Sequence, residues 1–160
     1  MRLRKISLMA VPVYCAVSSW ISFYLTVYIG AHFYVVKSLD ASGVTRVEID
    51  PVRAVILNAA LFLLVLVVGG LLLRRMTRTE LAVSAGIAAA IYLLIVVCQL
   101  LLPDFPLGLG VALAYVQNWT GTLASFLMKL GFGLNLSVIL SSFAPLFFIP
   151  FGKKEIDYES

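Results

Sequence analysis

Four long apolar runs divide the chain, and short polar segments separate them. An α-helix rises about 1.5 Å per residue, so about 20 apolar residues are needed to cross the hydrocarbon core of a bilayer. The runs therefore predict four transmembrane helices, at about residues 6–36, 52–73, 78–102 and 122–148. We expect an all-α integral membrane protein whose helices form an antiparallel bundle, with residues 1–160 as a single transmembrane domain.

The residues at the predicted helix ends support these boundaries. Asp50 can cap the free amides of the second helix, and Pro51 at its first position loses no hydrogen bond. Thr77 stands three residues before Glu80, the spacing of a capping box that opens the third helix. Pro103 cannot continue a helix, so the third helix is expected to end just before it.

Two connecting segments carry structure of their own in this interpretation. In the loop at residues 37–51, apolar and charged side chains alternate from Thr45 to Asp50, which predicts a short strand or hairpin at the membrane surface. The segment at residues 107–119 is too short to span a bilayer. We expect it to lie at the interface or to re-enter the membrane, with Tyr115 and Trp119 at headgroup depth.

Basic residues gather near the helix ends of one side: Arg2, Arg4, Lys5, Arg74, Arg75, Arg78, Lys153 and Lys154. The opposite side has three basic residues, and acidic residues are interleaved with them. The positive-inside rule places the basic clusters in the cytoplasm. Both termini, the loop at residues 74–77 and the tail at residues 150–160 are thus expected in the cytoplasm. The loops at residues 37–51 and 103–121 are expected on the extracytoplasmic side.

Composition agrees with a membrane location, because 62% of the residues are hydrophobic and only 12% are charged. Soluble domains carry about twice that charged fraction. We expect a multi-pass protein of the cell membrane, specifically a bacterial inner membrane, with the lipid bilayer as its solvent. The formal charge of +4 sits in short clusters rather than in a continuous basic stripe, so no nucleic-acid partner is predicted.

An aromatic and polar series recurs every fourth residue on the first helix: Trp20, Tyr24, Tyr28 and His32. Residues four apart share a helix face but drift around it, so the series forms a slanting ridge. We interpret Trp20 and Tyr24 as packing residues near mid-depth. Tyr28 and His32 reach the outer half of the bilayer.

Five polar side chains are predicted in that outer half and are candidates for a ligand-binding pocket: Tyr28, His32, Asn58, Gln99 and Lys129. Each also has a structural explanation. Asn58 and Gln99 can form hydrogen bonds between helices, and Lys129 can extend to the surface. His32 is either a proton-linked switch or a hydrogen-bonded interfacial side chain.

The inner half contains small residues at four-residue spacing, which lets helices approach closely. The predicted packing positions are Ser18, Ser22, Ala82, Gly86, Ala90, Gly133, Ser137 and Ser141. The stripes of the third and fourth helices are expected to meet on the cytoplasmic side.

Catalytic and metal-binding patterns are missing from the sequence. A single histidine and no carboxylate deep in any span predict no metal site, no cofactor and no catalytic set. The leading hypothesis is a non-catalytic accessory, assembly or regulatory subunit of a membrane complex, bound to another membrane protein or to itself as a homo-oligomer. The alternative is an oligomeric small-molecule or lipid binder or carrier that uses the outer pocket.

Overall fold

The computed structural model describes residues 5–39, 45–102 and 115–154. The described helices are α1 (Lys5–Leu8), α2 (Ala10–Phe33), α3 (Pro51–Leu73), α4 (Arg78–Leu101), α6 (Asn118–Lys129), α7 (Leu134–Ser141) and the 3₁₀ helix η1 (Ala144–Phe151). Two strands, β1 (Val35–Leu39) and β2 (Thr45–Ile49), lie between α2 and α3. Most of the segment predicted to re-enter the membrane, at residues 107–119, lies outside the described residues.

Four described segments are long and apolar enough to cross a membrane: Ala10–Gly30, Pro51–Leu73, Arg78–Leu101 and Leu134–Phe151. The prediction of four membrane-length helical segments is confirmed at this level. Asp50 caps α3 by accepting hydrogen bonds from the amides of Val52 and Arg53, and Thr77 and Glu80 form the predicted capping box of α4.

The first predicted helix, at residues 6–36, begins where expected but is interrupted at Met9 and ends early. Pro12 clashes with the carbonyl four residues earlier, at Leu8, so the helix breaks at Met9. A buried serine of α4 stabilises the break, because the Ser84 hydroxyl donates to the Leu8 carbonyl and accepts from the Val11 amide. At the other end α2 stops at Phe33, and the chain continues as β1.

The fourth predicted helix, at residues 122–148, is also wrong as a continuous span. Helix α6 ends at Lys129, and Gly131 has a φ of 94°, a left-handed conformation that favours glycine. The chain reverses there, and α7 begins after Gly133 and leads into η1. The fourth membrane-length segment is therefore α7 together with η1, and α6 is a separate helix packed against α7.

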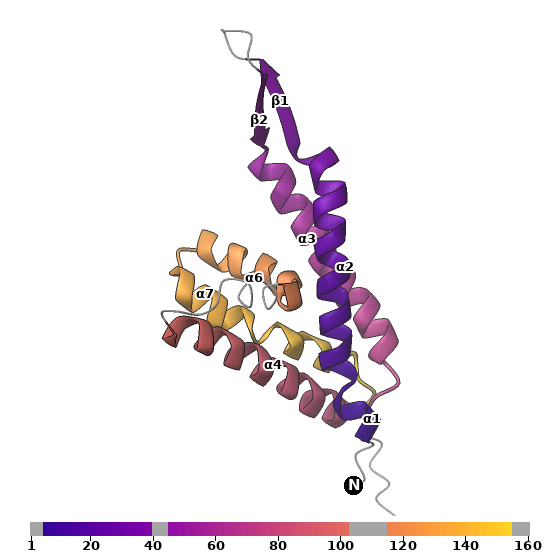
Figure 1. Ribbon diagram of the computed structural model, residues 1–160. Helices are drawn as coiled ribbons and strands as arrows, with labels where there is room; N and C mark the ends of the chain where they lie inside the picture. Colours follow the sequence, from indigo (N-terminus) through magenta and orange to yellow (C-terminus); the bar gives the residue numbers. More distant parts are fainter. Residues whose placement is uncertain (1–4, 40–44, 103–114, 155–160) are drawn as a thin grey trace, which may run out of the picture.

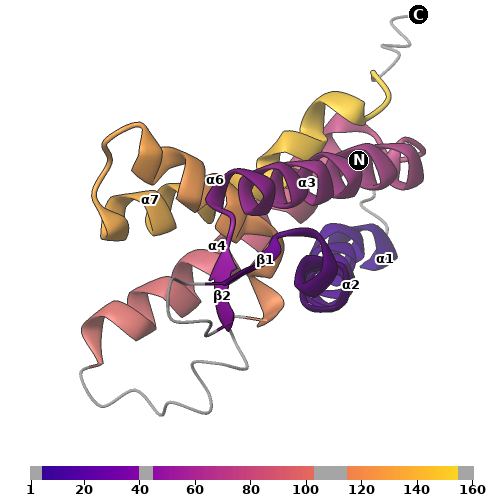
Figure 2. The ribbon, with the colours of Figure 1, turned by 90° about the horizontal axis from the view of Figure 1, so that it is seen from above.

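The elements form an arm and a second layer (Figure 1). The arm consists of α2 and α3 side by side, extended at one end by β1 and β2. These strands pair antiparallel, with Val35 opposite Ile49 and Leu39 opposite Thr45, so the predicted hairpin is present. The second layer contains α4, α6, α7 and η1. Figures 1 and 2 show α4 steeply inclined to α2, so the four segments do not run parallel as in the simplest antiparallel bundle.

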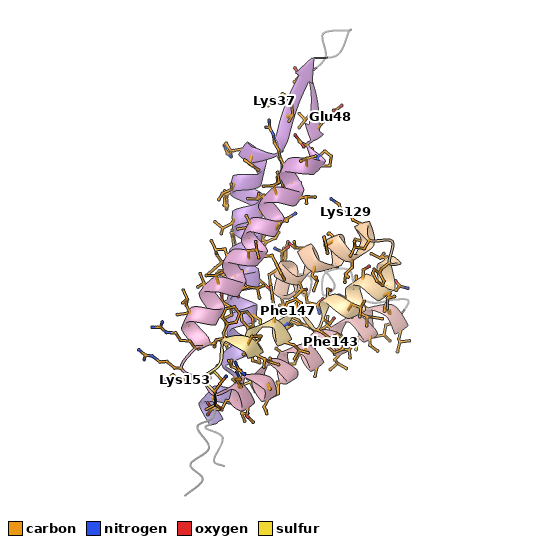
Figure 3. The ribbon with its side chains drawn as sticks, turned by 180° about the vertical axis from the view of Figure 1, so that it is seen from behind. Lys37, Glu48, Lys129, Phe143, Phe147 and Lys153 are labelled. Atoms are coloured by element: carbon orange, nitrogen blue, oxygen red, sulfur yellow. The ribbon has the colours of Figure 1, made fainter. Side chains whose placement is uncertain are left out.

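The two ends of the arm differ in what surrounds them. At the end opposite the strands, here called the terminal end, the Lys153 amide donates to the Met76 carbonyl, and the Lys153 carbonyl accepts from the Arg78 amide. These bonds join the segment after η1 to the α3–α4 connection, beside α1. Figure 3 shows Lys153 at this end, with Lys37 and Glu48 at the opposite, hairpin end.

The hydrophobic core lies between the arm and the second layer. Its largest fully buried side chains are Trp119 and Phe148, whose rings pack at 5.9 Å. Phe62 of α3 stacks on the other side of Trp119 at 5.4 Å. Trp119 is 2% exposed and belongs to the core, so its ring is covered by the chain itself, and its predicted headgroup depth stays a prediction.

Candidate functional site

An exposed row of aromatic side chains lies along α2, and we call Trp20, Tyr24 and Tyr28 the aromatic ridge. Their side chains are 60%, 43% and 68% exposed. The Trp20 and Tyr24 rings meet edge to face at 5.1 Å, and the Tyr24 and Tyr28 rings stack at 6.1 Å. The interpretation of Trp20 and Tyr24 as packing residues near mid-depth stays a prediction as regards depth, because the structure contains no membrane. They pack on each other and face outward.

The polar atoms of the ridge are unpaired within the described part of the chain. The indole N–H of Trp20 and the hydroxyls of Tyr24 and Tyr28 have no hydrogen-bond partner among those residues. Trp20 stands halfway along the membrane-length segment Ala10–Gly30. The ridge therefore presents hydrogen-bond donors on an apolar helix surface, at a depth where water is scarce if that segment crosses a bilayer.

The five residues of the predicted ligand pocket occupy separate environments. Tyr28 and His32 are exposed, and His32 Nδ1 lies 3.0 Å from the Tyr28 carbonyl oxygen within the same helix. Lys129 is exposed at the end of α6 (Figure 3). Asn58 and Gln99 are half-buried, and the Asn58 carbonyl accepts from the Thr122 hydroxyl at 3.3 Å. Among the described residues no hydrogen bond joins two of these five side chains, and the shared pocket stays a prediction.

The predicted packing positions divide into two groups. Ser18, Ser22, Ser137 and Ser141 are buried. Ala82 and Gly86 are half-buried, Ala90 and Gly133 are exposed, and a methyl group added at either glycine would meet no atom within 4 Å. The face of α4 that packs inside the chain is offset from the predicted one: Leu81, Ser84, Ala85, Ala88, Ala89, Tyr92 and Val96.

Two neighbouring glycines of α3, which the sequence analysis did not single out, allow the closest approach of the arm to η1. A side chain at Gly69 would collide with the rings of Tyr14 and Phe148. A side chain at Gly70 would collide with Phe151. Adjacent glycines in the middle of a helix are costly, and that was the signal available in the sequence.

A buried polar cluster joins α4 to the start of α6. The Tyr92 hydroxyl donates to the Val116 carbonyl at 3.1 Å and accepts from the indole N–H of Trp119 at 3.3 Å. The Gln117 side-chain amide donates to the Tyr92 carbonyl at 3.0 Å. Hydrogen bonds of this kind prevent polar groups from being buried unpaired, so the cluster fixes where α6 begins. It has a structural role.

Comparisons with family models, curated proteins and solved structures found no match to this chain. Its function is therefore inferred from its own geometry. The aromatic ridge offers donors and a large contact area, which suit recognition of another molecule.

Proposed function

We propose that this protein is a multi-pass membrane protein that serves as a non-catalytic accessory, assembly or regulatory subunit of a membrane complex. In this proposal a transmembrane helix of a different protein docks on the aromatic ridge. The observation that carries the proposal is the exposure of Trp20 and Tyr24 in the interior of a membrane-length helix, with polar atoms that have no partner among the described residues.

Lipid hydrocarbon alone cannot supply hydrogen-bond acceptors to these side chains. An unpaired N–H or O–H group in hydrocarbon costs free energy, and Trp and Tyr in membrane proteins concentrate at the interfaces. A partner helix can supply carbonyl or hydroxyl acceptors to the Trp20 and Tyr24 donors. It would also cover the aromatic rings, whose contact area is large.

The hairpin supports the proposal from outside the membrane. A two-stranded sheet is marginally stable on its own, and both of its outer edges offer unpaired backbone groups. Val47 and Ile49, on one face of β2, are 65% and 64% exposed. In the proposed complex the extramembrane part of the same partner covers this face of the hairpin.

The proposed orientation follows from charge. Exposed basic residues gather at the terminal end: Arg74, Arg75, Arg78, Lys153 and Lys154. By the positive-inside rule this end lies in the cytoplasm and the hairpin outside, as in a bacterial inner membrane. An extracytoplasmic signal from a reporter fused after residue 76 would contradict this orientation.

The test of docking is site-specific photo-crosslinking of the full chain in its native membranes. A photoreactive amino acid replaces Tyr24 in one variant and Leu63 in a matched control, because Leu63 is 59% exposed on α3 and lies outside the ridge. We expect position 24 to yield one discrete adduct with a different transmembrane protein. We expect no such adduct from position 63.

A second variant separates docking from folding. Tyr24→Leu with Tyr28→Leu removes the hydroxyls from exposed positions, so membrane levels should stay normal while the adduct formed from a photoreactive group at position 20 is lost. Identical adducts from positions 24 and 63, or none from either, would overturn the proposal. An adduct of two copies of this chain would assign the ridge to a homo-oligomer instead.

A further inference from the structure

A cavity of about 610 Å³, lined by both polar and apolar side chains, opens at the terminal end of the arm. Helices α1, α2, α3 and α4 and the α3–α4 connection contribute its lining: Ser7, Ala10, Leu72, Leu73, Arg75, Met76, Thr77 and Glu80. The Glu80 carboxylate in its wall is already engaged, because it accepts from the Thr77 amide at 3.1 Å and from the Ser7 hydroxyl at 3.4 Å. Arg75 is exposed and is the basic side chain of this lining.

An apolar groove of about 260 Å³ runs between α2 and α3 and shares Leu72 with the cavity. On α2 it is lined by successive helical turns from Tyr14 to Leu25, and on α3 by turns from Leu61 to Leu72. Of the hydroxyls in the described lining, those of Tyr14 and Ser18 are paired internally. The Tyr14 hydroxyl donates to the Val65 carbonyl at 2.7 Å, and the Ser18 hydroxyl donates to the Tyr14 carbonyl. The Ser22 hydroxyl has no such partner among the described residues, so an occupant of the groove meets an apolar surface with one unpaired hydroxyl.

The dimensions of the groove match a hydrocarbon chain. Leu61 and Leu72 are separated by about 16 Å along α3. One leaflet contributes about 15 Å to the hydrocarbon core of a bilayer. Spread over that length, 260 Å³ corresponds to a cross-section of about 16 Å². A helix about 10 Å in diameter has a cross-section of about 80 Å², so the groove is far too narrow for a helix.

The charge around the cavity determines the headgroup. Arg78 and Lys153 are exposed near Arg75, and the backbone hydrogen bonds of Lys153 to Met76 and Arg78 hold the Lys153 charge at the same end. Basic residues at a membrane surface attract anionic lipids. Glu80 keeps its negative charge while it accepts from Thr77 and Ser7. The basic side chains of Arg75, Arg78 and Lys153 outnumber it at this end, so the net charge around the cavity favours an anionic headgroup.

We infer that the cavity and the groove together form a binding site for one anionic phospholipid, with the phosphate at Arg75 and an acyl chain between α2 and α3. The inference shares with the proposed function the premise that the four spans lie in a membrane. It is otherwise independent, because the groove and the aromatic ridge use different residues of α2. Extraction of the chain from membranes by alkaline carbonate would remove that shared premise, whereas loss of lipid selectivity alone would leave the docking proposal intact.

The test is native mass spectrometry of the delipidated full-length protein, titrated with phosphatidylglycerol or phosphatidylcholine of the same acyl chains. We expect one phosphatidylglycerol to bind about fivefold more tightly than phosphatidylcholine, the preference that one basic contact at a membrane surface provides. Arg75→Gln should abolish the preference. Arg74→Gln is the matched control, since Arg74 is a neighbouring exposed arginine outside the cavity lining, and it should preserve the preference.

A second pair of variants tests the groove. Val17→Trp fills the groove from a residue that is 51% exposed and should weaken binding of both lipids, while Val13→Trp, one turn away and outside the groove, should not. Equal loss in Arg74→Gln and Arg75→Gln, or unchanged binding in Val17→Trp, would overturn the site. Displacement of the lipid by free glycerophosphate would overturn the role of the acyl chain.

Discussion

The two halves of α2 have the same backbone conformation and differ in how they are buried. In the half near the terminal end, Val11, Cys15 and Ser19 are completely buried. In the half near the hairpin, Tyr28 and Ile29 are exposed. One continuous helix thus serves as a core element over its first turns and as a surface element over its last.

The second layer accounts for this difference. Figure 1 shows α4, α6 and η1 beside the lower part of the arm, whereas the upper part of α2 has α3 as its helical neighbour. The terminal half of the arm is therefore stabilised by contacts within the chain. In the hairpin half, where most of the ridge and the open strands lie, more of the surface is left for lipid or a partner to cover.

The largest test of this comparison uses the two tryptophans. Trp119→Ala removes a ring that packs between Phe62 and Phe148, and we expect a loss of about 3–5 kcal/mol in the free energy of unfolding. Trp20→Ala should cost about 1 kcal/mol or less, because that ring is exposed and, in the described part of the chain, Tyr24 is its one aromatic neighbour. Both values come from denaturant titration of the protein in detergent micelles. Equal losses would show that the two halves are equally involved in folding.

A smaller effect is expected from removing one hydroxyl in each half. Tyr92→Phe leaves the Trp119 indole and the Val116 carbonyl without their partner, and we expect it to cost about 1–3 kcal/mol of stability. Tyr28→Phe should leave the stability of the isolated protein unchanged, since its hydroxyl has no partner in the described chain. A clear loss from Tyr28→Phe in the same titration would place that hydroxyl in a folded contact and weaken the case for an outward ridge.

The features that local physics determines could be predicted from the sequence. Hydropathy and length identified four membrane-length segments, and the spacing of Thr77 and Glu80 identified the cap of α4. Alternation along residues 45–50 identified the hairpin. Each of these depends on neighbouring residues alone.

The buried faces could not be predicted, because lipid-facing and protein-facing positions of a membrane helix are similarly apolar. On α4 the stripe at Ala82, Gly86 and Ala90 and the stripe at Ala85 and Ala89 both have small-residue spacing, and the second is the one that is buried. Trp20 and Trp119 are likewise indistinguishable by type, yet one is on the surface and the other in the core. Tertiary packing decides both cases.

The break after α6 was missed for a related reason. Glycine is common in transmembrane helices, so Gly131 and Gly133 were compatible with a continuous span. The left-handed conformation of Gly131 becomes necessary only because α7 turns back against α6. The candidate lipid site was missed as well, since it depends on the contact of α1 with α4 and on the α3–α4 connection.

The smallest expected effect concerns the helix cap at the hairpin end. Asp50 Oδ1 accepts from the Val52 amide at 2.9 Å and from the Arg53 amide at 3.1 Å. Asp50→Ala should cost about 1 kcal/mol, and Asp50→Asn much less because asparagine also caps helices well. The exposed ion pair of Asp50 with Arg53 adds little to either value.

The loss of stability in Asp50→Ala also reports how strongly the hairpin end of the arm is coupled to the core. If the hairpin half is only loosely coupled to the core, Asp50→Ala should speed amide hydrogen exchange in the first turn of α3 and in β2, while exchange in α4 stays unchanged. The Asp50→Asn variant serves as the control, with exchange close to that of the native protein in both regions. Faster exchange throughout α4 in the Asp50→Ala protein would mean that the arm unfolds as one cooperative unit with the second layer. The exposed end of α2 would then be stabilised by the core even though the described residues show few contacts between them. In that case, exposure alone would no longer identify this end of α2 as the part of the arm that binds a partner.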